Sequence, residues 1–445
     1  MDARFEPTIQ SMRSRRDLRY RQILTILLLF GGYGSLYFCR ADLSVASPLL
    51  IDEFAAHGMS RADAVIRIGS ITSFGVLAYA LGKLFLTGLG DLWGGRTSFL
   101  IGLGGATVFT LMFATGSFLP IFTIAWIGNR LTQSIAWAGL IKISSRWFDF
   151  SSYGAIIGIL SVSYLVGDAA ARQWMGVLIG HGDGWRAVFY LAAGATLLMF
   201  AGNLGLLRES RSDLGFAEAR TNPLNLFADS ESPPQSLAAL LAPLLKSRSF
   251  VLVCLLSLGC TIIRETFNSW TPVYLRDYLG YSVSSAAGTS AVFPAVGAAS
   301  VIITGWLSDR LGVNGRALIL LLGLSATVVA LLALTAVRPS AGGTLMPLIA
   351  IGSIAFCLLG PYSYLGGAFA ADFGGKQASA ASSGIIDGVG YLGAVMAGDS
   401  VARVSVAFGW HGVFVSLAAV GALAALGAGC LYALGRRAAA ARHLT

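Results

Sequence analysis

Long apolar runs separated by short polar turns dominate the chain. The runs fall at about 23–50, 63–90, 97–117, 119–145, 153–180, 186–207, 249–278, 285–308, 317–337, 344–371, 378–406 and 411–435. Each is long enough for one α-helix to cross a bilayer, which takes about 20 residues. The pattern predicts an all-α membrane protein with twelve transmembrane helices.

A polar stretch divides these runs into two sets of six. It contains Pro223, Pro233 and Pro234, which is typical of a flexible linker. We therefore expect two bundles joined by this linker. The expected parts are a basic N-terminus over 1–22, a first bundle over 23–207, the linker over 208–248, a second bundle over 249–436 and a tail over 437–445.

Composition and charge support the membrane assignment. Hydrophobic residues make up 55% of the chain and charged residues only 12%, whereas a soluble protein carries roughly 25% charged residues. The formal net charge is +9, and the basic residues collect in the N-terminus, the linker and the turns on the same side. The positive-inside rule then predicts cytoplasmic termini. We expect a monomer in a bacterial-type inner membrane, with no nucleic-acid partner.

Residues that could carry catalysis or hold a metal are few. The five cysteines are Cys39, Cys254, Cys260, Cys357 and Cys430. All lie in apolar runs, and their odd number and spacing predict reduced thiols and no metal site. The sequence offers no nucleophile–base pair at one depth, so we expect neither an enzyme nor a cofactor. Residues 1–22 are polar and rich in arginine, which argues against a cleavable signal peptide.

Four motifs recur in the same order in both sets of runs. Arg40 and Pro48 correspond to Arg264 and Pro272, TGLGD (87–91) to GWLSD (305–309), GILS (158–161) to GIID (384–387), and GWRAVF (184–189) to GWHGVF (409–414), at offsets of 218 to 226 residues. Parallel repeats of this kind build secondary transporters of the major facilitator type, whose substrate site lies near the midplane between the halves. The repeat predicts that fold, with two pseudo-symmetric six-helix bundles.

Two arginines lie deep inside apolar runs, at equivalent positions of the repeat. An arginine at the centre of a bilayer costs about 2.5 to 3.5 kcal/mol on insertion scales. The guanidinium groups of Arg40 and Arg264 match phosphate or carboxylate oxygens in pairs. The symmetric placement favours a shared anion site. In the alternative interpretation, each arginine pairs with a neighbouring acid or extends to the membrane surface.

Further polar residues at helical spacing could line the same cavity. They are Tyr33, Tyr37 and Ser44 with Arg40 on the first helix, Tyr79 and Lys83 on the second, Gln133 and Trp137 on the fourth, and Asp387 and Tyr391 on the eleventh. Lys83 either adds a third positive charge or pairs with an acid such as Asp168. For the others, hydrogen bonds between helices are the alternative to ligand contact.

Acidic residues inside the helices admit two roles. Asp168, Glu265 and Asp387 could take part in proton coupling or pair with a basic residue. Glu265 points about 100° away from Arg264 on a helix, so it need not face the same cavity. The turn residues Asp91, Arg96, Asp309 and Arg310 are expected to form salt bridges at helix ends, which would favour one conformation as gating contacts.

Several of these segments resemble one known family. FGGYGSLYFCRADLSVASPLL (30–50), AYALGKLFLTGLGD (78–91), TQSIAWAGLIKISSRWF (132–148), CTIIRETFNSWTPVYL (260–275), LRESRSDLGF (207–216), GYLG (390–393) and FGWHGVF (408–414) are similar to segments of the organophosphate:phosphate antiporters. This family of the major facilitator superfamily includes transporters of glycerol 3-phosphate, hexose phosphates and phosphoglycerates. The resemblance covers essentially the whole chain.

The resemblance also implies roles for particular residues. Arg40 and Arg264 match the family's phosphate-binding arginines and Lys83 its second-helix lysine, while Tyr33, Tyr37, Tyr79, Gln133, Trp137 and Tyr391 match positions that line the cavity. Ala41 stands where the family has a lysine, Gly167 where some members have a histidine, and Leu92 where a basic residue is usual. These departures lower the expected positive charge of the cavity and leave the substrate open.

The leading hypothesis is an antiporter that exchanges a small organophosphate for inorganic phosphate by alternating access. Two alternatives stay open at the level of sequence. One is a transporter-like membrane sensor of a phosphorylated metabolite. The other is a proton-coupled carrier of an organic carboxylate, in which Asp168 or Asp387 takes up the proton.

Overall fold

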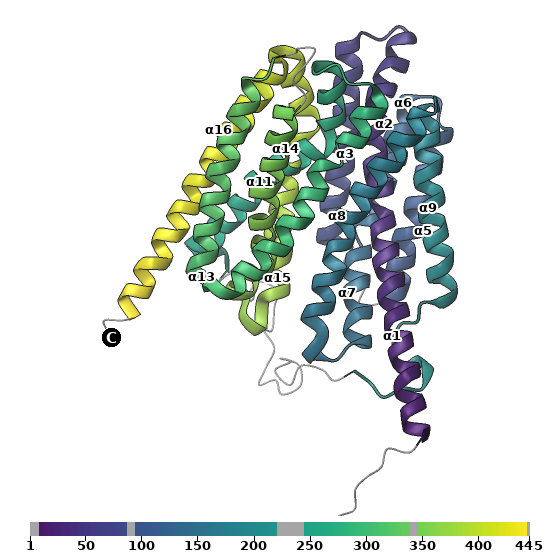
Figure 1. Ribbon diagram of the computed structural model, residues 1–445, viewed down its shortest axis with the longest axis vertical. Coiled ribbons are helices and arrows are strands. Elements are labelled where there is room, and N and C mark those ends of the chain that lie inside the picture. Colours follow the sequence, from purple (N-terminus) through teal and green to yellow (C-terminus); the bar gives the residue numbers. More distant parts are fainter. Residues whose placement is uncertain (1–8, 87–93, 220–243, 339–344, 443–445) are drawn as a thin grey trace, which may run out of the picture.

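The computed structural model describes residues 9–86, 94–219, 244–338 and 345–442. Within these ranges, the side chains of 9–15, 150–155, 308–314, 371–372, 374–381 and 437–442 are outside the description. The described residues form helices and turns without a strand. Figure 1 shows the helices of the first half (purple to teal) standing beside those of the second half (green to yellow). The predicted all-α class is confirmed.

The first half holds the helices that follow one another from α1 to α9. They are α1 (Ile9–Leu36), α2 (Phe38–Ala56), α3 (Arg61–Phe85), α5 (Gly95–Thr115), α6 (Leu119–Gln133), α7 (Ala136–Trp147), α8 (Phe150–Gly180) and α9 (Trp185–Leu206). The first and fourth apolar runs are each divided in two: the first at Tyr37, and the fourth at Ser134 and Ile135. These breaks separate α1 from α2 and α6 from α7, beside the polar residues Arg40 and Gln133.

The second half repeats this arrangement with longer continuous helices. It contains α11 (Arg248–Val273), η2 (Tyr274–Tyr278), α12 (Val283–Thr289), α13 (Val292–Thr335), α14 (Leu345–Tyr364), η3 (Leu365–Phe369), α15 (Ala370–Ala394), η4 (Val395–Ala397) and α16 (Asp399–Arg442). Most of the expected spans 285–308 and 317–337 lies in the continuous helix α13. The helix α16 contains the end of the span 378–406 and all of 411–435, and it turns at Gly409, a residue with φ +68. A positive φ is a conformation that glycine adopts without steric cost.

Nine helical segments of the described chain are long and apolar enough to cross a membrane. The longest, Ser382–Arg436, has 55 residues and holds two of the predicted spans. The fourth and fifth predicted runs are not among the nine. The helix of the fourth is broken and carries Asn129, Arg130 and Gln133. Those polar residues are buried inside the bundle.

The predicted linker begins as an ordered segment. Residues 208–219 include the 3₁₀ turn η1 (Ser212–Leu214). Arg211 is buried and donates to the carboxylate of Asp149 over 3.0 Å, so this part packs against the first half. The proline-bearing residues 220–243 are outside the description. The domain boundaries themselves stay predictions.

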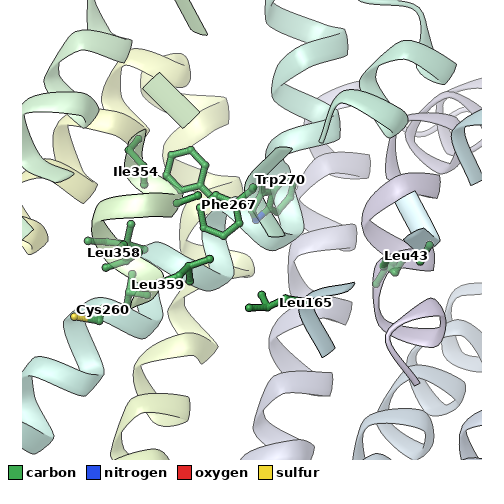
Figure 2. Packing of buried hydrophobic residues seen from close by; sticks show 14 of the residues in the cluster. Leu43, Leu165, Cys260, Phe267, Trp270, Ile354, Leu358 and Leu359 are labelled. Atoms are coloured by element: carbon green, nitrogen blue, oxygen red, sulfur yellow. The ribbon is translucent and has the colours of Figure 1, made fainter. Parts of the chain in front are cut away.

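One buried hydrophobic core extends across both halves. Figure 2 shows Leu43 of α2 and Leu165 of α8 on one side and Phe267 and Trp270 of α11 with Leu359 of α14 on the other. Apolar packing therefore holds the two halves against each other. In lipid, such contacts depend on close van der Waals packing rather than on exclusion of water.

Proline shapes the contact between the halves. Pro272 lies inside α11, and because proline has no N–H, it cannot donate to the carbonyl four residues earlier. That carbonyl belongs to Asn268, and it accepts hydrogen bonds from Ser44 Oγ and Arg172 Nη2 of the first half, each over 2.8 Å. The carbonyl left without its helical partner thus becomes a link between the halves.

Candidate functional site

Arg40 lies in the first turn of α2, directly after the break at Tyr37. Its Nε donates to Gln133 Oε1 over 2.8 Å and its Nη1 to the Tyr37 hydroxyl over 3.1 Å. The guanidinium carbon also lies 4.3 Å from the centre of the Tyr79 ring. Among the residues that the structure describes, no carboxylate contacts Arg40. Its positive charge is therefore held by neutral dipoles and aromatic faces.

Gln133 is itself fixed by its neighbours. Its Nε2 donates to Asn129 Oδ1 over 2.6 Å and to the carbonyl of Cys39 over 3.3 Å. With both amide hydrogens used in this way, the amide oxygen points at Arg40. The structure thus gives Gln133 a positioning contact with the arginine, which combines the two interpretations that the sequence left open.

Arg264 occupies the equivalent position on α11, but its surroundings differ. Its Nη2 donates to Glu265 Oε1 over 2.8 Å, and its guanidinium carbon lies 4.8 Å from the Tyr362 ring centre and 5.5 Å from that of Tyr391. The sequence analysis left open whether Glu265 faces this site. Glu265 does line the cavity, and it pairs with a basic residue, which is one of the two roles considered for it.

Arg40 and Arg264 line one enclosed cavity between the halves. The volume open to the centre of a water molecule is about 60 Å³, and a single water needs about 10 to 15 Å³ by this measure. The cavity therefore has room for a few waters. Its polar lining is Tyr37, Arg40, Ser44, Ser47, Thr72, Arg130, Tyr164, Asp168, Arg172, Arg264, Glu265, Asn268 and Ser269.

Two of the lining arginines escaped the sequence analysis. Arg172 of α8 is buried and pairs with Asp168 over 2.8 Å, and it also donates to Ser290 Oγ over 3.1 Å. Arg130 of α6 is buried too, and its guanidinium carbon lies 5.3 Å from the Tyr79 ring centre. Both arginines lie inside apolar runs, as Arg40 does. The sequence analysis missed them because it singled out only arginines at equivalent positions of the repeat.

Lys83 lies beside this cavity, outside the residues that form its wall. Its Nζ is 3.3 Å from Asp387 Oδ2, so its acidic partner is Asp387, and the suggested pairing with Asp168 is wrong. The Tyr79 and Tyr391 rings pack 4.8 Å apart, and Lys83 Nζ lies within 6 Å of both ring centres. Lys83 and Asp387 thus join α3 to α15 next to the two cavity arginines.

The remaining aromatic candidates form a stack within the first half. The Tyr33 ring lies 5.0 Å from Trp137 and 6.0 Å from Tyr37, and Tyr37 lies 5.4 Å from Tyr164. Of this group, Tyr37 and Tyr164 reach the cavity wall. Tyr33 and Trp137 pack behind them and support the orientation of Tyr37.

The position at which the resemblance leads one to expect a histidine is occupied by Gly167. A Cβ atom there would lie 2.3 Å from the carbonyl oxygen of Gly34 on α1. No side chain fits between α1 and α8 at this crossing. The departure from the family pattern is therefore imposed by close helix packing, which small residues permit.

Residues 10–398 match the sequence model of the Major Facilitator Superfamily. The chain belongs to this superfamily. Among solved structures, a bacterial homolog of the human lysosomal transporter Spinster superposes with a TM-score of 0.72 at 16% identity, covering 93% of this chain and 97% of that chain. This likeness confirms the predicted major facilitator fold, and the chain is an integral membrane protein.

Curated relatives span nearly the whole chain. A probable hexose phosphate transport protein of Chlamydia trachomatis is 25% identical over 92% of this chain and 91% of its own length. The glycerol-3-phosphate transporter of Bacillus subtilis is 23% identical over 91% of each chain. The membrane sensor protein UhpC of Escherichia coli is 26% identical over 92% of each. The suspected similarity to organophosphate transporters is confirmed, and neither fold nor relatives are those of an enzyme.

Ion pairs join the two halves at one end of the molecule. We call this the distal end: it carries the turn between α2 and α3, opposite the end at which α1 begins and α16 finishes (Figure 1). Arg276 contacts Asp52 through two hydrogen bonds, one over 3.0 Å. Arg61 contacts Asp52 over 2.9 Å and Asp277 over 2.8 Å.

The turn residues of the opposite end are partly outside the description. Asp91 is not among the described residues, and neither are the side chains of Asp309 and Arg310. Arg96 is described, and it donates to the backbone carbonyls of Leu207 and Leu204. Glu209 accepts from the backbone N–H of Gly95 and Arg96. These bonds lie within the first half, and the expected salt bridges of the turn residues stay predictions.

Proposed function

We propose that this protein exchanges a small organophosphate for inorganic phosphate by alternating access. The observation that carries the proposal is that Arg40 and Arg264, at equivalent positions of the repeat, line one enclosed cavity between the halves. The relatives named as hexose phosphate and glycerol-3-phosphate transport proteins support the choice of phosphate chemistry. A guanidinium group binds phosphate oxygens in pairs, which suits this ligand.

The charge of the empty cavity explains why exchange would dominate over one-way transport. Positive charge enclosed between two protein halves in lipid is costly, because no water solvates it. A bound anion contacts both arginines and removes this cost, so the closed intermediate becomes accessible. The empty protein crosses that intermediate slowly, and the site returns only with a second anion. Ligand and conformation are coupled by this differential stability.

We extend the proposal to the membrane and its orientation. The basic N-terminal segment and linker favour an inner membrane of bacterial type with both ends of the chain in the cytoplasm. In this orientation the distal end faces outward. The transporter would act as a monomer, with one site at the interface of its two halves.

Exchange measured in reconstituted vesicles tests the proposal. Vesicles loaded with radioactive phosphate should release it when glycerol 3-phosphate or a hexose 6-phosphate is added outside. Arg40→Lys and Arg264→Lys each reduce the two-point contact with phosphate to a single point. Since one hydrogen bond to a charged group contributes about 1.5 to 3 kcal/mol, we expect about a 10- to 150-fold loss of exchange.

Arg403→Lys serves as the matched control, because its side chain is 63% exposed and is not part of the cavity wall. It should exchange at the wild-type rate. Near-normal exchange by both cavity variants would overturn the proposal. Folded protein in the vesicle is verified for each variant by its elution as a single species before reconstitution.

A membrane sensor is the second candidate function. The similarity to the sensor protein UhpC, at 26% identity, is the observation that favours it. A sensor would bind the same phosphorylated ligand in the same cavity, without a need for turnover. Ligand binding by purified protein together with exchange no faster than in empty vesicles would support the sensor and reject the antiporter.

A further inference from the structure

Arg130 is a buried guanidinium without an acceptor. It lies on α6, is 5% exposed and forms part of the cavity wall. Within the described part of the chain no hydrogen-bond acceptor or carboxylate contacts it, and its Nε is buried without a partner. A buried charge that lacks partners is expensive. The cavity therefore presents a donor group whose acceptor has to come from outside the chain.

The acids of the site do not contact Arg130. Glu265 is bonded to Arg264 and Asp168 to Arg172. Asp42 lies within electrostatic reach of Arg130, but it is not part of the cavity wall. Its Oδ1 accepts from the N–H of Leu43, and its Oδ2 has no partner. Facing the cavity, the guanidinium groups of Arg40 and Arg130 are thus both without a contacting carboxylate.

These two guanidinium groups also lie close together. Arg40 is 4.3 Å and Arg130 5.3 Å from the centre of the same Tyr79 ring, so the distance between them cannot exceed the sum of these two. Gln133, which holds Arg40, follows Arg130 by one helical turn. Both arginines also line the same cavity, so an anion bound there has both guanidinium groups in its wall.

We propose that Arg130 is an anion-binding residue, and that with Arg40 it selects a doubly charged phosphoryl group. The positive charges of Arg40 and Arg130, which no carboxylate of the described residues contacts, match the two negative charges of inorganic phosphate or a phosphate monoester. A phosphate diester, which carries one negative charge, leaves one guanidinium unpaired. The inference rests on the proposed function and adds to it the charge of the preferred substrate.

Calorimetric titration of the purified full chain tests this selectivity. The probes are methyl phosphate, a dianion at pH 8, and dimethyl phosphate, a monoanion. Wild-type protein should prefer methyl phosphate. Arg130→Gln should weaken methyl phosphate binding about 10- to 100-fold, the loss of one or two charge-assisted hydrogen bonds, and dimethyl phosphate binding less than about 3-fold. Arg130→Lys keeps the charge and should keep most of the preference.

Stability measurements separate a ligand contact from a structural role. Because Arg130→Gln removes an unpaired buried charge, the ligand-free variant should unfold at the same or a higher temperature than wild type, while phosphate should stabilise it less. Equal weakening of both probes, no weakening of either, or a lower unfolding temperature without ligand would overturn the inference. Failure of wild-type protein to bind phosphate at all would instead reject the proposed function. Arg403→Gln is the control and should match wild type in every measurement.

Discussion

The two halves present the same residue to the cavity in different electrostatic settings. In the first half, Arg40 is held by the neutral groups of Gln133 and Tyr37. In the second half, Arg264 is bonded to the carboxylate of Glu265. An anion that enters the cavity therefore meets an available guanidinium in the first half and a neutralised one in the second.

This difference suggests an order of events for a symmetric fold. The first half supplies the initial anion contact, and Arg264 joins when its bond to Glu265 is exchanged for one to the ligand. Because engagement of the second half costs an existing ion pair, closure of the halves depends on the ligand. Repeat symmetry thus fixes where the arginines lie, while a single acidic neighbour makes their roles unequal.

The largest expected effect comes from removing an acid that neutralises a fully enclosed arginine. Asp168→Asn leaves Arg172 without its acidic partner, where both side chains are less than 10% exposed. Removal of one member of a buried pair costs about 3 to 5 kcal/mol. We expect the unfolding free energy in detergent to fall by about 3 kcal/mol, the lower end of this range, because Arg172 keeps its hydrogen bonds to Ser290 and Asn268.

Arg403→Gln again gives the contrast, since its ion pair with Asp399 lies at the surface. Its loss should change the unfolding free energy by less than about 1 kcal/mol. If Asp168→Asn lowered the unfolding free energy as little as Arg403→Gln does, removal of the carboxylate from a buried arginine would have no special cost. The contrast between arginines that contact a carboxylate and arginines that do not would then fail, and with it the comparison between the halves.

An intermediate effect, on the affinity for phosphate, is expected from the substitution that tests the comparison of Arg40 with Arg264 most directly. Glu265→Gln removes the carboxylate from Arg264 and makes the second half resemble the first. Since the ligand no longer displaces a charge-assisted bond, the dissociation constant for phosphate should fall about 10-fold, which corresponds to 1.4 kcal/mol. Titration calorimetry measures this change, and the exchange rate should fall because the bound anion leaves more slowly. Unchanged or weaker phosphate binding would contradict the proposed order of events.

The smallest effect is expected at the distal end, away from the cavity. Arg276→Gln removes the contact between Arg276 and Asp52, whose side chains are 22% and 40% exposed. Partly exposed pairs contribute about 0 to 1 kcal/mol, so the population open at this end should rise by at most about 5-fold.

Labelling of a single cysteine at position 47 reports this opening, because Ser47 lines the cavity. The experiment uses a background without the native cysteines and a reagent that does not cross the membrane. Faster labelling of the Arg276→Gln protein is expected. Equal labelling with and without the substitution would show that the distal ion pairs do not hold the halves together.

The fold class could be predicted from the sequence because a chain that crosses lipid can adopt few architectures. Apolar runs of membrane-crossing length and a repeated Arg-Pro spacing are sufficient for the fold class, and Arg40 and Arg264 indeed share a cavity. The helix breaks at Tyr37 and Ser134 were not predicted. They depend on how polar residues bond across helices, which periodicity along one helix does not reveal.

Partner choice inside the site was the part that sequence reasoning could not determine. Glu265 bonds its own neighbour, Lys83 bonds Asp387, and Asp168 bonds Arg172 four residues further along its helix. Side-chain reach decides the first pair and helix packing the second. The third follows an i, i+4 spacing that was visible in the sequence, and it was missed because Arg172 has no counterpart in the repeat.

The ion pair between Asp52 and Arg276 has a consequence for the symmetry of the molecule itself. The two residues are 224 positions apart, the same offset that separates Arg40 from Arg264. A residue that touches its own counterpart lies on the rotation axis that relates the repeats. Two identical halves would bring together two aspartates or two arginines at this point and repel each other. Attraction on the axis therefore requires that the halves differ there, so two copies of one half could not reproduce this contact.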